Sequence, residues 1–490
     1  MLRIARLLLW LMLVVLAAPA YAQATWSAPL TLSAARQDAI YPQVAVDRDG
    51  DAIFVWQRRD GTTDCGGSGC FRIQARVRSA AGSLTPVQTL SAPGQHAYAP
   101  DAAVDQNGDA VFSWTRQDKT TDCRHNYGNP PSCGRIQTRT RSAGGTLSAV
   151  HTLSAPGYDA GSIWGPDTVA APVAVDQSGN AVFVWLLDDD KTTFSCCFRV
   201  QARVRSATGA LSATQTLSGY DAYFPRVDVD PSGNAVFAWT LGAGCASGCA
   251  RFETRARSAA GVLSATQTLA QTVLSYSNRT CDAACIPADL AVDQNGNAIF
   301  AWERFDGTSQ YCCYRAQTRA RSPAGTLSAT QTLSLAGKQE WLPRVAVDPA
   351  GDAVFAWEGY DDTTGCGGLG CPRVQARTRS AAGALGAIEY ISNPERLTGQ
   401  PADVAVDQDG NSVFVWDALD STSDCGGTHC LRVKARSRSA AGVLSAIQLL
   451  AQPGQHAYNP RVAINPGGNA AAAWQRFDGT NDRVQGATGP

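Results

Sequence analysis

Short runs of alternating apolar and polar residues recur along the chain in one fixed order. The repeated phrase is P-x-V-A-V-D-x-x-G-[ND]-A-V-F-x-W, then a loop, then R-V-Q-A-R-x-R-S-A-A-G-x-L-S-A-x-Q-T-L-S. Its tryptophan returns every 54 to 71 residues, which is long enough for a four-stranded unit. The eight copies are marked by Trp56, Trp114, Trp185, Trp239, Trp302, Trp357, Trp416 and Trp474.

Each copy predicts four β-strands, A to D. In the first copy they are residues 44–46, 52–56, 72–79 and 84–90, separated by turns that contain Gly50 and Gly82. Strand B is apolar on both faces, as expected of a strand buried inside a sheet assembly. Packing between neighbouring copies is therefore the first explanation for the tryptophans, and stacking against a sugar is the alternative.

The two ends of the chain predict how the array closes. The last copy has strands A to C but no strand D, while residues 26–33 match the strand D phrase of residues 147–154. An N-terminal strand that completes the last sheet closes a ring and leaves no free sheet edge. We therefore expect an all-β, eight-bladed β-propeller of four-stranded blades.

The A–B hairpin carries a family resemblance. Its phrase, as in residues 404–411, is similar to the V-x-D-x-x-G-N hairpin of NHL-type and SBBP-type bacterial β-propeller repeats, although the last copy has Asn465 in place of Asp. The remainder of each copy looks more like secreted bacterial repeat proteins. The resemblance implies a propeller fold and no particular activity.

The first 22 residues are typical of a secretory signal peptide. Arg3 and Arg6 precede an apolar run over residues 7–16, and Ala20-Tyr21-Ala22 predicts cleavage before Gln23. We expect a secreted or periplasmic protein whose single propeller domain is residues 23–490, with no membrane span. Loss of the two arginines changes the formal net charge from −1 to −3, which argues against a nucleic-acid partner.

Export also favours disulfides for the 16 cysteines. Seven copies have a pair between strands B and C, and an eighth pair lies in an insertion, so we expect each pair to bridge its own loop. The two adjacent pairs leave cross-loop bridging open. Redox chemistry and zinc binding are the alternatives. The pairs are Cys65/Cys70, Cys123/Cys133, Cys196/Cys197, Cys245/Cys249, Cys281/Cys285, Cys312/Cys313, Cys366/Cys371 and Cys425/Cys430.

The B–C loops and the D–A links emerge on one face of a propeller, and the loops repeat an acidic-hydroxyl phrase. Turn formation explains this phrase, and hydroxyl or calcium recognition is the sharper alternative. The strand C arginines are expected to pair with aspartates of neighbouring strands. The candidate ligand-binding residues are Asp60, Thr62, Asp64, Asp118, Asp122, Asp188, Asp189, Asp190, Asp306, Asp361, Asp362 and Asp478.

No Ser-His-Asp order and no H-E-x-x-H motif is present, and the repetition favours several equivalent binding sites. We therefore expect a non-enzymatic binding or structural module, a monomer whose partner is an extracellular glycan or protein, with calcium as the one possible cofactor. The alternative is a secreted enzyme that acts on carbohydrate or another polymer at the central channel. Departures from the repeat, at residues 162–164, 188–190 and 270–286, are where its acids would lie.

Overall fold

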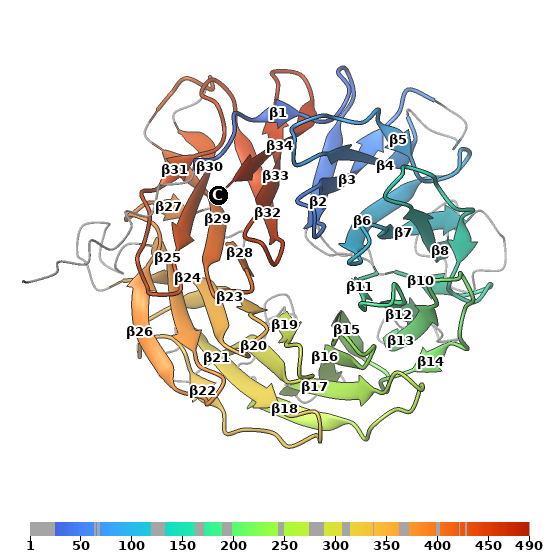
Figure 1. The fold of residues 1–490 in the computed structure, drawn as a ribbon, viewed down its shortest axis with the longest axis vertical. Helices are drawn as coiled ribbons and strands as arrows, with labels where there is room; N and C mark the ends of the chain where they lie inside the picture. Colours follow the sequence, from blue (N-terminus) through green and yellow to red (C-terminus); the bar gives the residue numbers. More distant parts are fainter. Residues whose placement is uncertain are drawn as a thin grey trace, which may run out of the picture.

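The computed structural model describes residues 25–62, 65, 69–118, 133–161, 171–188, 198–243, 249–273, 289–305, 314–336, 338–361, 372–397, 402–420, 422–426 and 429–489. Within these ranges, eight antiparallel sheets stand around a central channel (Figure 1). The chain is therefore an all-β, eight-bladed propeller, as the repeat predicts. The described residues form no helix, and so they include none that could cross a membrane.

The first four blades follow the chain in order, each from its innermost strand A to its outermost strand D. Blade 1 has β2 (Ala39–Val46), β3 (Ala52–Arg59), β4 (Phe71–Arg78) and β5 (Gln88–Thr89). Blade 2 has β6 (Ala97–Val104), β7 (Ala110–Asp118), β8 (Cys133–Arg141) and β9 (His151–Thr152). Blade 3 has a divided strand A, β10 (Asp159–Ala160) and β11 (Val173–Val175), then β12 (Ala181–Asp188), β13 (Phe198–Arg205) and β14 (Gln215–Thr216). Blade 4 has β15 (Ala222–Val229), β16 (Ala235–Ala243), β17 (Cys249–Arg257) and β18 (Gln267–Val273).

The last four blades complete the ring. Blade 5 has β19 (Asp289–Val292), β20 (Ala298–Phe305), β21 (Tyr314–Arg321) and β22 (Gln331–Thr332). Blade 6 has β23 (Glu340–Val347), β24 (Ala353–Tyr360), β25 (Pro372–Arg379) and β26 (Leu385–Tyr390). Blade 7 has β27 (Arg396–Leu397), β28 (Asp403–Val406), β29 (Ser412–Asp420), β30 (Cys430–Arg438) and β31 (Gln448–Leu449). Blade 8 has β32 (Ala457–Ile464), β33 (Ala470–Phe477), β34 (Asp482–Gly489) and, from the other end of the chain, β1 (Leu30–Thr31).

The N-terminal strand closes the ring as the sequence predicts. β1 pairs antiparallel with β34, with Leu30 opposite Gly486. The Leu32 N–H then donates to the Val484 carbonyl at 2.8 Å, and the Leu32 side chain is buried between blades 8 and 1. Both ends of the described chain therefore belong to one sheet.

Strand B forms the core between neighbouring blades. Phe54 and Trp56 pack against Val484 of blade 8, and the opposite face of β3, with Ile53 and Val55, packs towards blade 2. All eight repeat tryptophans are at most 2% exposed, so the packing explanation is confirmed and sugar stacking on these rings is wrong.

Strand A is longer than predicted in five blades. β2 begins at Ala39 rather than Val44, and a bulge separates Ile40 from Gln43. Tyr41 in this bulge has a φ of 54°, which is uncommon for a residue with a side chain. Its N–H donates to the Gln475 amide of blade 8 at 3.1 Å, so the neighbouring blade stabilises the strained residue. Ala99, Phe224, Leu342 and Asn459 hold the same conformation in blades 2, 4, 6 and 8.

The two faces of the ring are built differently. The A–B and C–D turns form one face, which we call the turn face, and the B–C loops and D–A links form the other, the loop face. In blade 1, Asp47 Oδ1 accepts the Asp51 N–H at 2.8 Å, and Asp51 Oδ1 accepts the Ala80 N–H at 2.9 Å. The second acid thus joins the A–B turn to the C–D turn, a contact that only needs an acceptor, which is why Asn can replace it.

Candidate functional site

Acidic residues of the loop face pair with the first arginine of strand C in their own blade. Asp60 Oδ2 accepts the Arg72 Nε–H at 2.7 Å, and Asp60 Oδ1 accepts the Thr62 backbone N–H at 3.1 Å. Burial alone would raise the pKa of the Asp60 carboxyl, but the hydrogen bonds from Thr62 and Arg72 hold it below its usual value. The same pair recurs as Asp118–Arg135, Asp361–Arg373, Asp420–Arg432 and Asp478–Arg483.

The remaining strand C arginines correct the expected ladder of Asp partners. Arg76 Nε donates to the Thr85 carbonyl of its own blade, and its Nη1 reaches the Leu32 carbonyl of the preceding blade. Arg141 Nε donates to the Gln88 amide oxygen of the preceding blade at 2.8 Å. Among the described residues, the aspartate partners go to the first arginine of strand C, while the later arginines meet carbonyl and amide oxygens of strand D or, for Arg438, the Glu389 carboxylate of the preceding blade.

The predicted ligand-binding residues fall into three groups. Asp60, Thr62, Asp118, Asp361 and Asp478 belong to the loop-face pairs just described, which orient the loops. Asp188 ends β12. Outside the described residues lie Asp64, Asp122, Asp189, Asp190, Asp306 and Asp362, together with the predicted signal peptide, residues 162–164 and most of residues 270–286.

Two loops of this face have described disulfides. Cys65–Cys70 and Cys425–Cys430 have Cα–Cα distances of 5.8 and 5.7 Å, so both pairs bridge their own loop as predicted. Cys133 is also disulfide-bonded, and Cys249 begins β17. Asp424 lies beside the second bridge, but those two sulfurs are bonded to each other and not available to a metal. Outside the described residues lie Cys123, Cys196, Cys197, Cys245, Cys281, Cys285, Cys312, Cys313, Cys366 and Cys371.

The loop face also gathers partly exposed aromatic rings, which sequence reasoning missed because it considered only the tryptophans. Tyr220 is 49% exposed with the Arg199 guanidinium 3.7 Å above its ring, and Tyr390 is 39% exposed beside Arg373. By contrast, the A–B and C–D turns contain no aromatic residue. The rings at the loop-face ends of the strands and in the D–A links are Tyr41, Phe71, Tyr98, Tyr158, Phe198, Tyr220, Tyr223, Phe224, Tyr314, Trp341, Tyr360, Tyr390, Tyr458 and Phe477.

Six strand A residues of alternating charge surround the central channel. They occupy the position four residues before the Asp or Asn that begins the A–B turn. All eight blades have this position, and in the other two blades it is held by the uncharged residues Gln43 and Pro172. We call the six the channel ring. In order around the propeller they are Asp101, Arg226, Asp289, Arg344, Asp403 and Arg461.

The channel ring joins neighbouring blades. Asp289 Oδ1 lies 4.0 Å from Arg226 Nε and 3.9 Å from Arg344 Nη1, while its Oδ2 accepts the Val345 N–H of blade 6 at 3.0 Å. Asp101 and Asp403 accept the Val173 and Val462 N–H groups in the same way. Strand A is the innermost strand of its blade, so its N–H groups on the channel side have no neighbouring strand to pair with. Each aspartate therefore accepts a hydrogen bond from one such N–H group of the next blade.

The low polarity of the channel wall shifts the pKa values of this ring. Burial raises the pKa of Asp101 to about 6, against the opposing hydrogen bond from Val173 and the attraction of Arg226 and Arg461. Burial also lowers the pKa of Arg226 to about 10, with a further contribution from the like charge of Arg344. The neutral total charge of the ring favours a structural role in holding the channel together.

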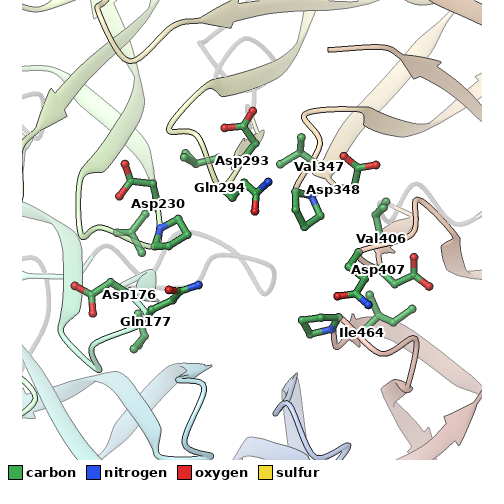
Figure 2. A pocket seen from close by; sticks show the side chains of 17 residues that line it. Asp176, Gln177, Asp230, Asp293, Gln294, Val347, Asp348, Val406, Asp407 and Ile464 are labelled. Carbon is green, nitrogen blue, oxygen red and sulfur yellow. The ribbon is translucent and has the colours of Figure 1, made fainter.

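At the turn face the channel opens into a cavity of about 320 Å³. Figure 2 shows that the turn aspartates, such as Asp230 and Asp293, point their carboxylates away from its centre, while Gln177 and Gln294 point inwards. The Asp176 carboxylate faces Gly233 of the next blade. Gly233 has a φ of +84°, and a Cβ added to it would lie 2.6 Å from Asp176 Oδ2. These aspartates therefore serve turns and blade contacts, and the cavity is lined by amide and apolar groups.

Two buried glutamates near the loop face have raised pKa values. Glu303, directly after Trp302, accepts the N–H of the strained Leu342, and burial raises the pKa of its carboxyl to about 7. Glu340 is completely buried against Gly359, and burial raises the pKa of its carboxyl to about 9 against the smaller effects of Trp357, Arg315 and Lys338. A carboxyl with a pKa near 7 can exchange a proton at neutral pH.

No protein-family model and no curated protein sequence matches the chain. Among solved structures it is similar to the polysaccharide lyase Uly1, with 9% identity and a TM-score of 0.47 over 94% of this chain and 99% of that one. A protein of unknown function from Dyadobacter fermentans gives 11% identity, a TM-score of 0.41 and coverage of 96% and 99%. An α-L-arabinofuranosidase from Fusarium graminearum gives 13% identity and a TM-score of 0.40, with coverage of 65% of this chain and 91% of that one. Likenesses this distant carry no inference about what the chain binds or does.

Proposed function

We propose that this propeller is an exported recognition module that binds a glycan on its loop face. The supporting observation is that the partly exposed aromatic rings of the described residues lie on that face, beside Asp–Arg pairs, with Trp26 at the turn face as the exception. Aromatic rings offer a flat apolar surface and the polar pairs offer donors and acceptors, which together suit the apolar face and the hydroxyl groups of a sugar. The hydrogen-bonded and disulfide-bridged loops would be ordered before binding, which lowers the entropy lost on association.

A glycan array tests this proposal. The oxidised protein, residues 23–490, is applied to the array with calcium and with a chelator, and we expect saturable binding to one class of sugar. Calcium dependence would indicate metal ions in the acidic loops, where calcium remains a prediction. A blank array in both buffers would rule out the glycan proposal and leave a protein partner.

A pair of variants locates the binding face. Tyr98→Ala removes one of the partly exposed loop-face rings, and we expect it to weaken glycan binding by about fivefold or more. Val443→Ala is the matched control, because Val443 is 66% exposed on the turn face. Equal affinities for the two variants would place the binding surface elsewhere.

Glu303 favours a second candidate, an enzyme that acts on carbohydrate. Its pKa of about 7 suits a general acid or base, and the pKa of the Tyr314 hydroxyl nearby is raised by burial and, to a smaller extent, by the charge of Glu303. Gln57 makes the same backbone contact in blade 1, so Glu303→Gln should fold normally. If this candidate is correct, the wild type releases sugar ends from a panel of polysaccharides and the variant is slower by about 100-fold; no release by the wild type would remove it.

A further inference from the structure

Two places on the loop face repeat the same set of side chains. One lies between blades 1 and 2 and the other between blades 7 and 8, and each combines a B–C loop with the D–A link that follows it. We call them the twin sites. The first consists of Asp60, Thr62, Arg72, His96 and Tyr98, and the second of Asp420, Thr422, Arg432, His456 and Tyr458.

The same hydrogen bonds hold both sites in place. Arg72 Nε donates to Asp60 at 2.7 Å and its Nη1 to the Gln95 carbonyl at 2.9 Å. In the second site, Arg432 Nε donates to Asp420 at 3.1 Å and its Nη1 to the Gln455 carbonyl at 2.8 Å. Each arginine thus fixes the loop against the link, and a disulfide closes each loop.

Each histidine is held in one orientation. The Phe71 N–H donates to His96 Nδ1 at 3.1 Å, and the Leu431 N–H donates to His456 Nδ1 at 3.2 Å. Because Nδ1 accepts in both cases, the hydrogen-bond geometry assigns the ring proton to Nε2. Both rings are half-buried, so each presents a fixed edge on the loop face.

A tyrosine follows each histidine two positions later in the chain, and in the first site its ring stacks on the histidine. The rings of His96 and Tyr98 stack with centroids 5.5 Å apart and an interplanar angle of 22°, and Phe71 contacts both rings. Tyr458 follows His456 at the same spacing, and Leu431 takes the place of Phe71. Where blades 1, 4 and 6 begin a long strand A, the position of the histidine is taken by Asp38, Asp221 and Gln339.

We infer that the twin sites bind two equivalent units of one glycan chain, a neutral polymer of β-linked hexoses. This inference rests on the proposed function and adds the position, the number and the sugar class of the sites. A β-linked hexose with equatorial hydroxyls has a flat apolar face that fits the Tyr–His pair. An anionic sugar is not favoured, because each arginine is already paired with an acid of its own site, and Arg432 also pairs with Asp424.

Two such sites on one rigid ring would act together on a polymer. They are separated by two blade positions, since blades 8 and 1 lie between them (Figure 1). Once one site holds a polymer, the second meets the same chain at a high effective concentration, and the overall affinity rises without a new contact. A short oligosaccharide that occupies a single site should bind each one independently.

Barley β-glucan and cellotetraose are the two probes for this inference. Calorimetry with cellotetraose should give two equivalent sites per chain for the wild type and one for His96→Ala or His456→Ala. With β-glucan, either substitution should reduce the affinity by about 10-fold or more, because bivalent attachment is lost. Tyr98→Leu and Tyr458→Leu should act in the same way while keeping the histidine contact to the backbone.

His151→Ala is the matched control, because this histidine lies on the outermost strand of blade 2, and the melting temperature of every variant checks its fold. A protein that binds some other glycan of the array, or binds the two probes with unchanged stoichiometry in all four variants, would overturn the twin sites and leave the proposed function standing. A protein that binds no glycan at all would overturn both.

Discussion

Single residues that depart from the repeat are responsible for the unusual chemistry of this chain. Glu340 stands where blades 1, 2, 4 and 8 begin strand A with alanine, and Gly359 faces it where Arg58 and Arg116 stand in blades 1 and 2. A Cβ on Gly359 would overlap the Glu340 carboxyl, so the glycine provides the room that the longer side chain occupies.

Glu340 should make stability depend on pH. Because the pKa is raised to about 9 in the folded state, the folded chain keeps a proton that the unfolded chain releases above its ordinary value of 4.5. The contribution of this carboxyl is complete below about pH 4.5 and is lost as the pH rises to about 9. Melting temperatures from pH 5 to 9 should therefore fall more steeply for the wild type than for Glu340→Gln.

Glu389→Gln is the control for that measurement, because Glu389 is partly exposed and pairs with Arg438 at 2.9 Å. Its pH profile should follow the wild type. Parallel curves for all three proteins would show that the Glu340 carboxyl is ionised and solvated in the folded state.

Strands of the innermost row depend on their neighbours more than the repeat suggests. Strand B could be predicted because its apolar residues alternate onto two buried faces, and its register is fixed by Trp56 and its equivalents. The first half of strand A could not, because the Tyr41 conformation depends on Gln475 of another blade. The channel-ring residues occupy a constant position before the turn Asp or Asn, so the position itself can be read from the repeat. Their pairing could not be predicted, because the charges of one copy are paired with those of other copies.

Loss of one channel-ring arginine should weaken two blade contacts. Arg344→Met removes the positive charge between Asp289 and Asp403 and should lower the free energy of unfolding by about 2–3 kcal/mol, less than for a fully buried pair because the side chains retain some solvent. Chemical denaturation measures it, with Gln43→Met as the control at an uncharged position of the same series.

A double-mutant cycle separates the charge from the packing. Asp289→Asn keeps an oxygen for the Val345 N–H, so its combination with Arg344→Met should cost less than the sum of the single changes. Strict additivity would contradict an electrostatic role for the pair.

At the scale of the whole molecule, the ring is closed by hydrogen bonds rather than by a peptide link. β1 provides strand D of blade 8, and Leu32 fills the core between blades 8 and 1. The same position in blade 1 is held by Leu90, which is buried to the same degree within an unbroken part of the ring. The two leucines therefore allow the closure to be tested against an internal standard.

Leu32→Ala and Leu90→Ala should each cost about 2–5 kcal/mol as buried truncations. Only Leu32→Ala should also release the closure, so amide exchange should quicken in β1, β33 and β34 and leave blades 3 to 6 unchanged. Equal exchange patterns in the two variants would show that the closure opens no more readily than any other blade boundary.

The closing sheet also determines which way the propeller would be presented. Thr25 and Gly489 line one cavity of about 330 Å³ together with Gly50 and Asn469 of the A–B turns, so both ends leave from the turn face. Any domain, linker or surface joined to either end would lie behind the ring, and the aromatic loop face would point outwards from the attachment. The orientation of a displayed molecule is thus fixed by where its first strand pairs, and a fusion at either terminus would leave the loop face unobstructed.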